Sequence, residues 1–247
     1  MQRVLDIDLD FFVYDPVYWP PVDVRPNVDD HPVWPIDEAL AYLRERCDLS
    51  ARLPGFVTEN HGELFPLWRQ AIIDGRLLTP FHVTHLDAHA DLGLGDAGYV
   101  YLLTELLLEE PQNRWWPRLG FDGLNDGNHL AFAVACRWIS DLVYVHGPGG
   151  GDDELAYVMR DFDPETSEIQ LPLLTQNQIY DLQSQKAVVP ERLEPVVPYR
   201  SIRSETLEAD EPFDFICLTR SPPYTPEEAD GLFDAIRESF IAPSLQN

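Results

Sequence analysis

The sequence has little positive charge. Its 17 lysine and arginine residues stand against 43 aspartate and glutamate residues, for a formal net charge of −26. A surface of this sign repels phosphates, which argues against nucleic acid or an anionic membrane as a partner. It permits a cationic substrate, although an acidic surface also serves solubility alone. The net charge therefore argues against nucleic acid and anionic membranes, but it does not by itself identify a substrate.

Cysteine is also scarce. Cys47, Cys136 and Cys217 are odd in number, widely spaced and without a Cys-x-x-Cys pair, so we expect neither a disulfide framework nor a structural zinc site. No apolar run approaches membrane-spanning length, and the amino-terminal segment has no secretory hydrophobic region. These absences predict a cytoplasmic protein that makes no membrane contact.

Length and patterning predict a single α/β domain over residues 1–247. Hydrophobic residues make up 45% of the chain, which is enough for one substantial core. Short apolar runs alternate with amphipathic stretches, and this alternation predicts a three-layer αβα fold with a mostly parallel central sheet. The expected strands lie near 5–9, 53–57, 81–86, 142–146 and 213–218, with weaker candidates at 156–160, 169–174 and 196–202. The expected helices lie near 36–47, 63–74, 97–110 and 128–140, with another after 225.

The most informative stretch is Thr84-His85-Leu86-Asp87-Ala88-His89-Ala90-Asp91. It reads as a buried strand that ends in a loop, with Asp87, His89 and Asp91 at alternate positions. Alternate residues of an extended chain point the same way, so two carboxylates and an imidazole should converge. Open α/β sheets bind ligands at the carboxyl ends of their strands. This set of side chains suits a divalent cation such as manganese.

Two other segments offer further ligands. Asp6, Asp8 and Asp10 alternate along a predicted strand and share one face, although aspartate is depleted from strands. His61 lies in a turn between a predicted strand and helix, where a lone histidine is more often a capping or surface residue. An acidic chain also produces Asp-x-His-x-Asp by chance. The metal interpretation therefore depends on whether the three segments meet.

Six ligands are too many for one catalytic zinc, but they suit two metal ions that share carboxylates. With these motifs the chain resembles the ureohydrolases of the arginase/deacetylase fold, which carry Gly-Gly-Asp-His, Asp-Ala-His-x-Asp and Ser-Phe-Asp-Val-Asp-(x2)-Asp-Pro. Residues 87–91 match the second motif at every position. Asp8-Leu9-Asp10, followed by Asp15-Pro16, looks like the third. Residues 59–63 take the place of the first, and only His61 carries over.

The order of these motifs is similar to that of the peptide arginases. The third motif precedes the other two here, whereas it follows them in ordinary arginases. The Glu59-x-His61-x-Glu63 turn and the late Ser221-Pro222 segment add to this likeness. The resemblance implies a hydrolase that converts arginine side chains in a ribosomally made precursor peptide to ornithine, with release of urea. It also implies two Mn²⁺ ions per chain.

The resemblance implies roles for individual residues. The metal roles fall on six of them: His61 and Asp91 for the first ion, His89 and Asp10 for the second, and Asp8 and Asp87 as bridges. Asp91 would also be catalytic, because it could take a proton from the attacking water and pass it to the leaving amine.

Two further roles follow from Gly127-Asn128-His129, which resembles the Gly-Asn-x-His of arginases with one residue missing. His129 would be catalytic as a proton shuttle, or would cap a helix, and Asn128 would bind substrate. Arginases hold the guanidinium with a glutamate after the last strand. Residues 217–222 contain no acid, so the guanidinium partner is not identified.

Other functions stay open from the sequence. The same fold could hydrolyse free arginine, agmatine or an acylated amine, and a non-catalytic acidic binding module is a third possibility. We find no counterpart for the polar side chains that recognise the ammonium and carboxylate of free arginine. The proline-rich segment 16–36 and the segment 150–212 are long enough to form an open rim around a peptide.

Overall fold

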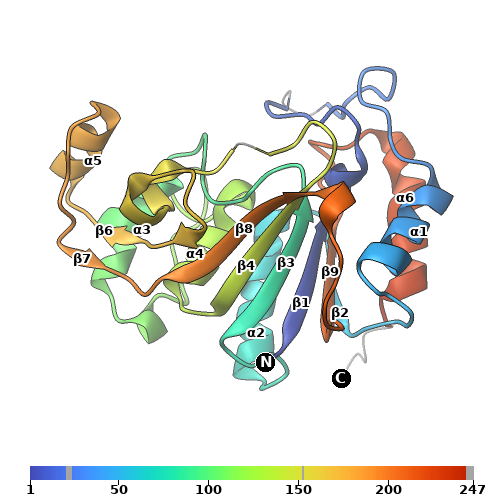
Figure 1. The fold of residues 1–247 in the computed structure, drawn as a ribbon, viewed down its shortest axis with the longest axis horizontal. Helices are drawn as coiled ribbons and strands as arrows, with labels where there is room; N and C mark the ends of the chain where they lie inside the picture. Colours follow the sequence, from blue (N-terminus) through green and yellow to red (C-terminus); the bar gives the residue numbers. More distant parts are fainter. Residues whose placement is uncertain (21–23, 152, 243–247) are drawn as a thin grey trace.

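The computed structural model describes residues 1–20, 24–151 and 153–242. Within these residues, seven strands form a central sheet in the order β2-β9-β1-β3-β4-β8-β5 (Figure 1). Their bounds are Arg3–Asp8 (β1), Gly55–Thr58 (β2), Phe81–Asp87 (β3), Ile139–His146 (β4), Glu168–Ile169 (β5), Val197–Arg203 (β8) and Phe215–Thr219 (β9). Each neighbouring pair is parallel except β5, which runs antiparallel to β8.

Helices cover both faces of this sheet, which confirms the three-layer αβα fold (Figure 1). Helices α2 (Leu64–Ile73) and α4 (His129–Ala135) pack on one face, and α1 (Ile36–Arg46) and α6 (Asp230–Phe240) pack on the other. The two resulting cores are separate, with Trp68 buried in the first and Phe233 in the second. No helix of the described residues is long and apolar enough to cross a membrane.

A smaller lobe lies beyond β8, at the left of Figure 1. It contains α3 (Gly98–Thr104), α5 (Gln176–Gln183) and a two-stranded sheet of β6 (Pro172–Leu173) and β7 (Arg192–Leu193). Short 3-10 helices complete the described fold, at Leu9–Phe12, His61–Glu63, Leu106–Leu108, Pro111–Asn113, Asp126–Asn128, Ala156–Val158, Arg160–Phe162, Ser204–Thr206 and Glu227–Ala229.

The pattern of β1 explains how acidic residues come to lie inside this fold. Leu5 and Ile7 point into the core beneath α1 and α6. Asp6 and Asp8 alternate with them and therefore point to the face that α2 and α4 cover. Both carboxylates are buried, because β1 lies between β3 and β9.

Parallel register brings the carboxyl ends of several strands to one edge of the sheet. Ile7 pairs with Leu86, and Asp8 pairs with Thr219, so β1, β3 and β9 end side by side. Asp87 ends β3 directly beside the end of β1. This edge is where an open α/β sheet binds ligands.

Three expected elements differ from the structure. The helix expected over 97–110 ends at Thr104, because Glu105 leaves helical geometry, and a 3-10 helix follows over Leu106–Leu108. The helix expected over 128–140 ends at Ala135, because Arg137 takes a left-handed φ of 59° and turns the chain into β4 at Ile139. The sequence around this turn is apolar and contains no glycine or proline, so the end of the helix could not be recognised from the sequence. The strand expected over 156–160 is a pair of 3-10 turns.

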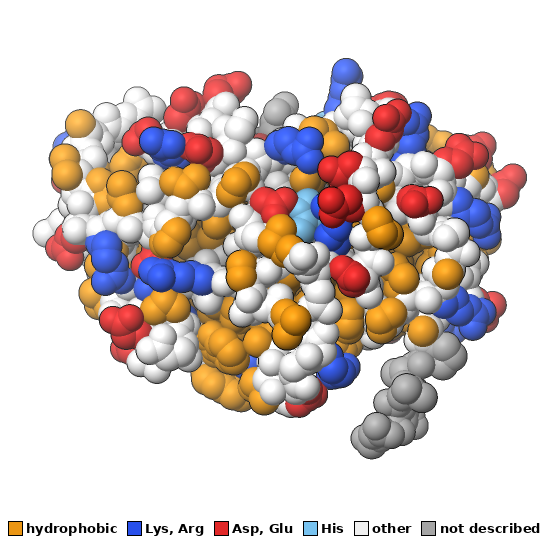
Figure 2. All heavy atoms as spheres, turned by 60° about the horizontal axis from the view of Figure 1, so that its bottom comes forward, with side chains coloured by type: hydrophobic (Ala, Val, Ile, Leu, Met, Phe, Trp, Pro, Cys, Tyr) orange, Lys and Arg blue, Asp and Glu red, His pale blue; other side chains and the backbone are white. Residues whose placement is uncertain are grey.

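Figure 2 shows one face of the molecule, where acidic and basic side chains are interspersed. Hydrophobic side chains gather in the lower part of this view. The excess of acidic residues is therefore not concentrated on this face.

A buried ion pair ties the small lobe to the body of the protein. Arg114, which is 1% exposed, lies 2.9 Å from the Glu194 carboxylate and also donates to the carbonyl oxygen of Ala135, at 2.7 Å. The second carboxylate oxygen of Glu194 accepts from Arg137, at 2.9 Å. Removing one partner of a buried pair leaves the other charge without compensation.

We predict that Glu194→Gln lowers the free energy of unfolding by about 3 kcal/mol, because Arg114 stays buried without its counter-charge. Urea denaturation measures the change. Glu168→Gln is the matched control, since its pair with Arg160 is solvent-exposed and should contribute much less to stability. Equal effects of the two substitutions would contradict a stabilising role for the buried pair.

Candidate metal centre

A cluster of carboxylates and imidazoles lies at the carboxyl edge of the sheet and unites the three segments expected from the sequence. Asp8 ends β1, His61 follows β2, and Asp87 ends β3. Five of its members are no more than 6% exposed, and only the His89 side chain is more open, at 18%. All six predicted metal ligands are in this cluster: Asp8, Asp10, His61, Asp87, His89 and Asp91.

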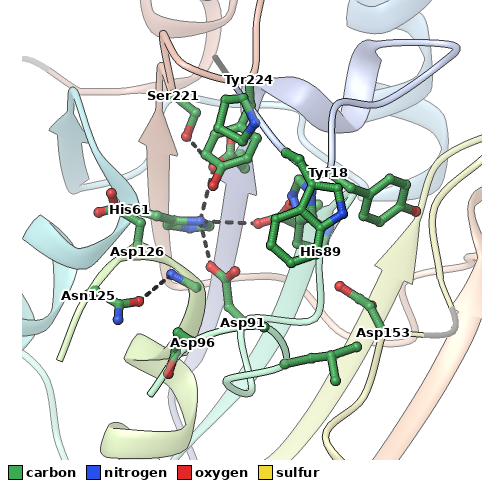
Figure 3. Close-up of a pocket in the computed structure, with 17 residues that line it drawn as sticks. Tyr18, His61, His89, Asp91, Asp96, Asn125, Asp126, Asp153, Ser221 and Tyr224 are labelled. Carbon is green, nitrogen blue, oxygen red and sulfur yellow. Dashed lines mark hydrogen bonds and ion pairs between the residues drawn. The ribbon is translucent and has the colours of Figure 1, made fainter. Parts of the chain in front are cut away.

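His61 lies among three of the carboxylates (Figure 3). Its Nδ1 is 3.1 Å from Asp8 Oδ2, 3.1 Å from Asp87 Oδ2 and 2.9 Å from Asp91 Oδ2. Three carboxylate oxygens and one imidazole nitrogen thus converge on a small volume. Asp8, His61 and Asp87 form the first set that could hold an ion, and Asp91 is grouped with His61 and His129 in an overlapping set.

His89 lies in a second set. Its Nδ1 is 3.1 Å from Asp10 Oδ2 and 3.5 Å from Asp87 Oδ1. The other oxygen of Asp10 accepts a hydrogen bond from the backbone of Ala88, which fixes the carboxylate. Asp87 therefore presents one oxygen to His61 and the other to His89, which is the arrangement of a bridging carboxylate.

The backbone is strained at two residues of the site. Asp91 and Ser221 both take left-handed conformations, with φ of 51° and 47°. Such conformations cost non-glycine residues on the order of 1 kcal/mol or more, and they concentrate at functional sites. In Ser221 the conformation accompanies a hydrogen bond from its hydroxyl to Asp8 Oδ2.

The unsatisfied atoms of the cluster fit a metal centre. Asp10 Oδ2, His61 Nδ1 and Asp91 Oδ2 are buried and have no partner in hydrogen-bonding geometry, although His89 Nδ1 lies 3.1 Å from the first and the other two lie 2.9 Å apart. Burial, together with the charge of neighbouring aspartates, raises the pKa of Asp8 and of Asp10 above the usual value. A bound cation would reduce the repulsion between the carboxylates, because it neutralises their charge. It would also accept the lone pairs of the atoms that lack hydrogen bonds.

Asp6, which the sequence analysis grouped with Asp8 and Asp10 as a possible ligand but which has no place in the six implied metal roles, is fully buried beneath the cluster. Its Oδ1 is 3.2 Å from His61 Nε2, and its Oδ2 is 3.1 Å from His85 Nδ1 and 3.5 Å from His129 Nε2. Burial favours a raised pKa for Asp6, but the charge of His61 and hydrogen bonds from the imidazoles hold the pKa well below its usual value. Asp6 thus fixes the ring of His61 from the side opposite the carboxylates.

His85 was missed by the sequence analysis. It occupies the position two before Asp87 on the same face of β3, and its Nε2 is 3.2 Å from Asp87 Oδ2. The alternation that singled out Asp87, His89 and Asp91 extends backwards to His85. His85 could therefore have been found by continuing this pattern one step towards the amino terminus.

His129 is also in the cluster. It is fully buried at the start of α4, and its Nδ1 is 3.1 Å from Asp91 Oδ2. It is not among the residues that line the pocket described below. Its role as a proton shuttle stays a prediction, while its contacts are those of a residue that orients Asp91.

Asn128 has a structural task. Its amide nitrogen donates to Asp96 Oδ2 and to the carbonyl oxygen of Gly123, and its amide oxygen accepts from the backbone of Asn125. The side chain is 1% exposed and lies outside the pocket wall. The substrate contact predicted for Asn128 stays a prediction that these bonds do not favour.

A pocket of about 280 Å³ opens above the cluster. This volume lies at the low end for small-molecule sites. Its floor includes the metal-ligand candidates. Its walls carry aromatic side chains and three further carboxylates: Tyr18, Trp19 and Tyr224, and Asp96, Asp126 and Asp153 (Figure 3).

Comparison with known proteins adds no family to this description. A scan of the chain against protein-family models gives no match, and a search among curated proteins finds none either. The structure itself shows a buried cluster of aspartates and histidines that could bind metal, at the ligand-binding edge of an αβα fold.

We predict that Asp6→Asn weakens manganese binding about 10- to 100-fold, because the His61 ring loses the carboxylate that orients it. Competition with a chelator measures the affinity. Asp141→Asn is the matched control, since it alters a similar carboxylate–imidazole contact, with His82, on the opposite face of β3. Unchanged affinity in the Asp6 variant would show that the contact does not position His61.

Proposed function

We propose that this protein is a dinuclear manganese hydrolase that converts arginine side chains of a peptide to ornithine and urea. The observation on which the proposal rests is Asp87, whose two oxygens face His61 and His89 in two adjacent ligand sets. A single-zinc deacetylase would need only one of these sets, so the presence of both His61 and Asp10 favours two ions. The Asp-Ala-His-x-Asp motif and the order of the motifs supply the resemblance to the peptide arginases.

The chemistry needs this kind of centre. Resonance deactivates the guanidinium carbon, and water is a poor nucleophile at neutral pH. Two bound divalent cations supply Lewis-acid activation of water, and they are favoured by oxygen ligands with a little imidazole. The protein's own part is to hold the reacting groups and to move protons.

Asp91 is placed to move those protons. Water adds to the guanidinium carbon and the bond from that carbon to Nε breaks, so that both water protons end on the leaving nitrogen. The products are the ornithine ammonium group and neutral urea. Asp91 lines the pocket, and its Oδ2 lies 2.9 Å from His61 Nδ1 and 3.1 Å from His129 Nδ1. A carboxylate in that position can accept a proton and return it to the amine.

The pocket favours a peptide over free arginine. No lysine or arginine is among the described residues that line it. The carboxylate of a free amino acid would therefore find no cationic partner and would meet acidic side chains instead. A peptidyl arginine has no such carboxylate, and its cationic side chain suits the acidic wall. Agmatine also lacks the carboxylate, which makes it the informative small substrate.

We predict that manganese-loaded protein converts arginine to ornithine in a peptide, with urea as the second product. Mass spectrometry of the peptide and a urea assay measure the reaction. The specificity constant for the peptide should exceed that for free arginine by about 100-fold, because the free carboxylate is left unpaired. Similar constants for the two would contradict the peptide assignment, and preference for agmatine would indicate a small-amine ureohydrolase.

We predict about two manganese ions per chain after loading. Asp87→Ala should lose both ions, because each ligand set uses this carboxylate, whereas Asp10→Ala should lose only the one held with His89. Elemental analysis after gel filtration counts them, and Asp141→Asn should keep both. One tightly bound zinc in the wild type would instead support a deacetylase-type centre.

A further inference from the structure

Three carboxylates of the pocket wall lie outside the metal centre, and two of them are engaged in holding loops. Asp96 accepts hydrogen bonds on both oxygens, from the backbone of Gly98 and from the Asn128 amide. Asp126 Oδ1 accepts from the backbone of Gly62. These bonds explain both residues without a ligand.

Asp153 differs from the other two. Its Oδ2 accepts a hydrogen bond of 2.9 Å from the backbone of Ala90, but its Oδ1 is buried and has no partner among the described residues. Figure 3 shows its carboxylate directed towards the space that His89 and Asp91 also face. Buried polar atoms in native proteins are usually paired, so this oxygen points to a ligand that donates to it.

The electrostatics of Asp153 agree with a cationic ligand. Burial raises the pKa of this carboxyl to about 6, so it is largely ionised at neutral pH. An ionised carboxylate with an unpaired buried oxygen is costly unless a donor with positive charge reaches it. No arginine or lysine of the described pocket lining does so.

We propose that Asp153 binds the guanidinium group of the substrate. This inference rests on the proposed function. At the end of β9 and in the turn that follows it, Thr219 bonds Thr58, Arg220 pairs with Glu59 and Ser221 bonds Asp8. The guanidinium offers several donors in one plane, and one edge can pair with Asp153 while the carbon faces the metal centre.

The anchoring of Asp153 makes it suited to this task. Ala90, which holds its Oδ2, lies between His89 and Asp91 in the chain. The carboxylate that binds the cation is therefore fixed to the same loop that carries metal ligands. Such a connection keeps the guanidinium carbon at a constant distance from the centre, which is what orientation in catalysis requires.

The chemistry also predicts what Asp153 excludes. Citrulline has nearly the shape of arginine but carries no charge, and an acylated lysine is likewise neutral. Their N–H groups can donate hydrogen bonds to the carboxylate, but they bring no positive charge, so Asp153 would stay ionised without a counter-charge. Asp153 would thus select a cationic side chain over neutral isosteres.

The test compares two peptides that differ only in arginine or citrulline. In the wild type, we expect the inhibition constant of the citrulline peptide to exceed the KM of the arginine peptide by about 10- to 100-fold. Asp153→Asn keeps an acceptor for Ala90 but removes the charge. It should raise KM for the arginine peptide by a similar factor, lower kcat less, leave the manganese content unchanged, and nearly abolish the discrimination between the peptides.

Glu154→Gln is the matched control. It removes the same charge one residue along the chain, where Glu154 bonds Tyr199 outside the pocket, so KM and discrimination should change less than about twofold. Retained discrimination in Asp153→Asn, or no discrimination in the wild type, would overturn the inference. If the wild type releases no urea, the proposed function fails. The peptide is then not consumed, and fluorescence anisotropy of the two labelled peptides decides the role of Asp153 by itself.

Discussion

Mutual repulsion among buried carboxylates is the constraint that the carboxyl edge of this sheet has to satisfy. Asp8, Asp87 and Asp91 all approach one nitrogen of His61, at distances of 2.9 to 3.1 Å. Like charges at such separations stay together only if positive charge lies among them. Imidazoles supply part of it, and the atoms left without partners show where cations would supply the rest. The strands and loops at this edge of the sheet therefore place positive groups next to the buried carboxylates.

The fold brings about the crowding through strand alternation and parallel register. In β1 the apolar residues enter one core and the acidic residues face the other side, where His61 and His129 arrive from the segments that lead into α2 and α4. Two loops then close the site with strained residues, Asp91 and Ser221. Precise placement thus comes from rigid strands, while strain is confined to the loops that they anchor.

Much of this was predictable from periodicity, and the remainder depends on contacts between distant segments. Alternation around Asp87 and in the amino-terminal segment predicted five of the six candidate ligands and the edge of the sheet on which they lie, although Asp10 falls in the 3-10 helix that follows β1. His61 came from its place in a turn and from the family resemblance. Alternation could not tell that Asp6 lies deeper than Asp8 and touches three imidazoles, because depth is decided by the neighbouring strands. Asp153 lies in a segment without periodicity, and its position is set by one hydrogen bond to Ala90. Asn128 matched a motif, but its bonds to Asp96 and Gly123 give it a different task.

The central position of β1 in the sheet affects the order in which the protein folds. Asp8 and Ser221 are hydrogen-bonded although 213 positions separate them in the chain. The strand that carries the first acidic residues must therefore wait for β9 before it has neighbours on both sides. Contacts of such sequence separation form slowly. Because β9 also lies between β1 and β2, a growing chain would not yet hold His61 in place beside Asp8, and any metal binding at this cluster would follow folding.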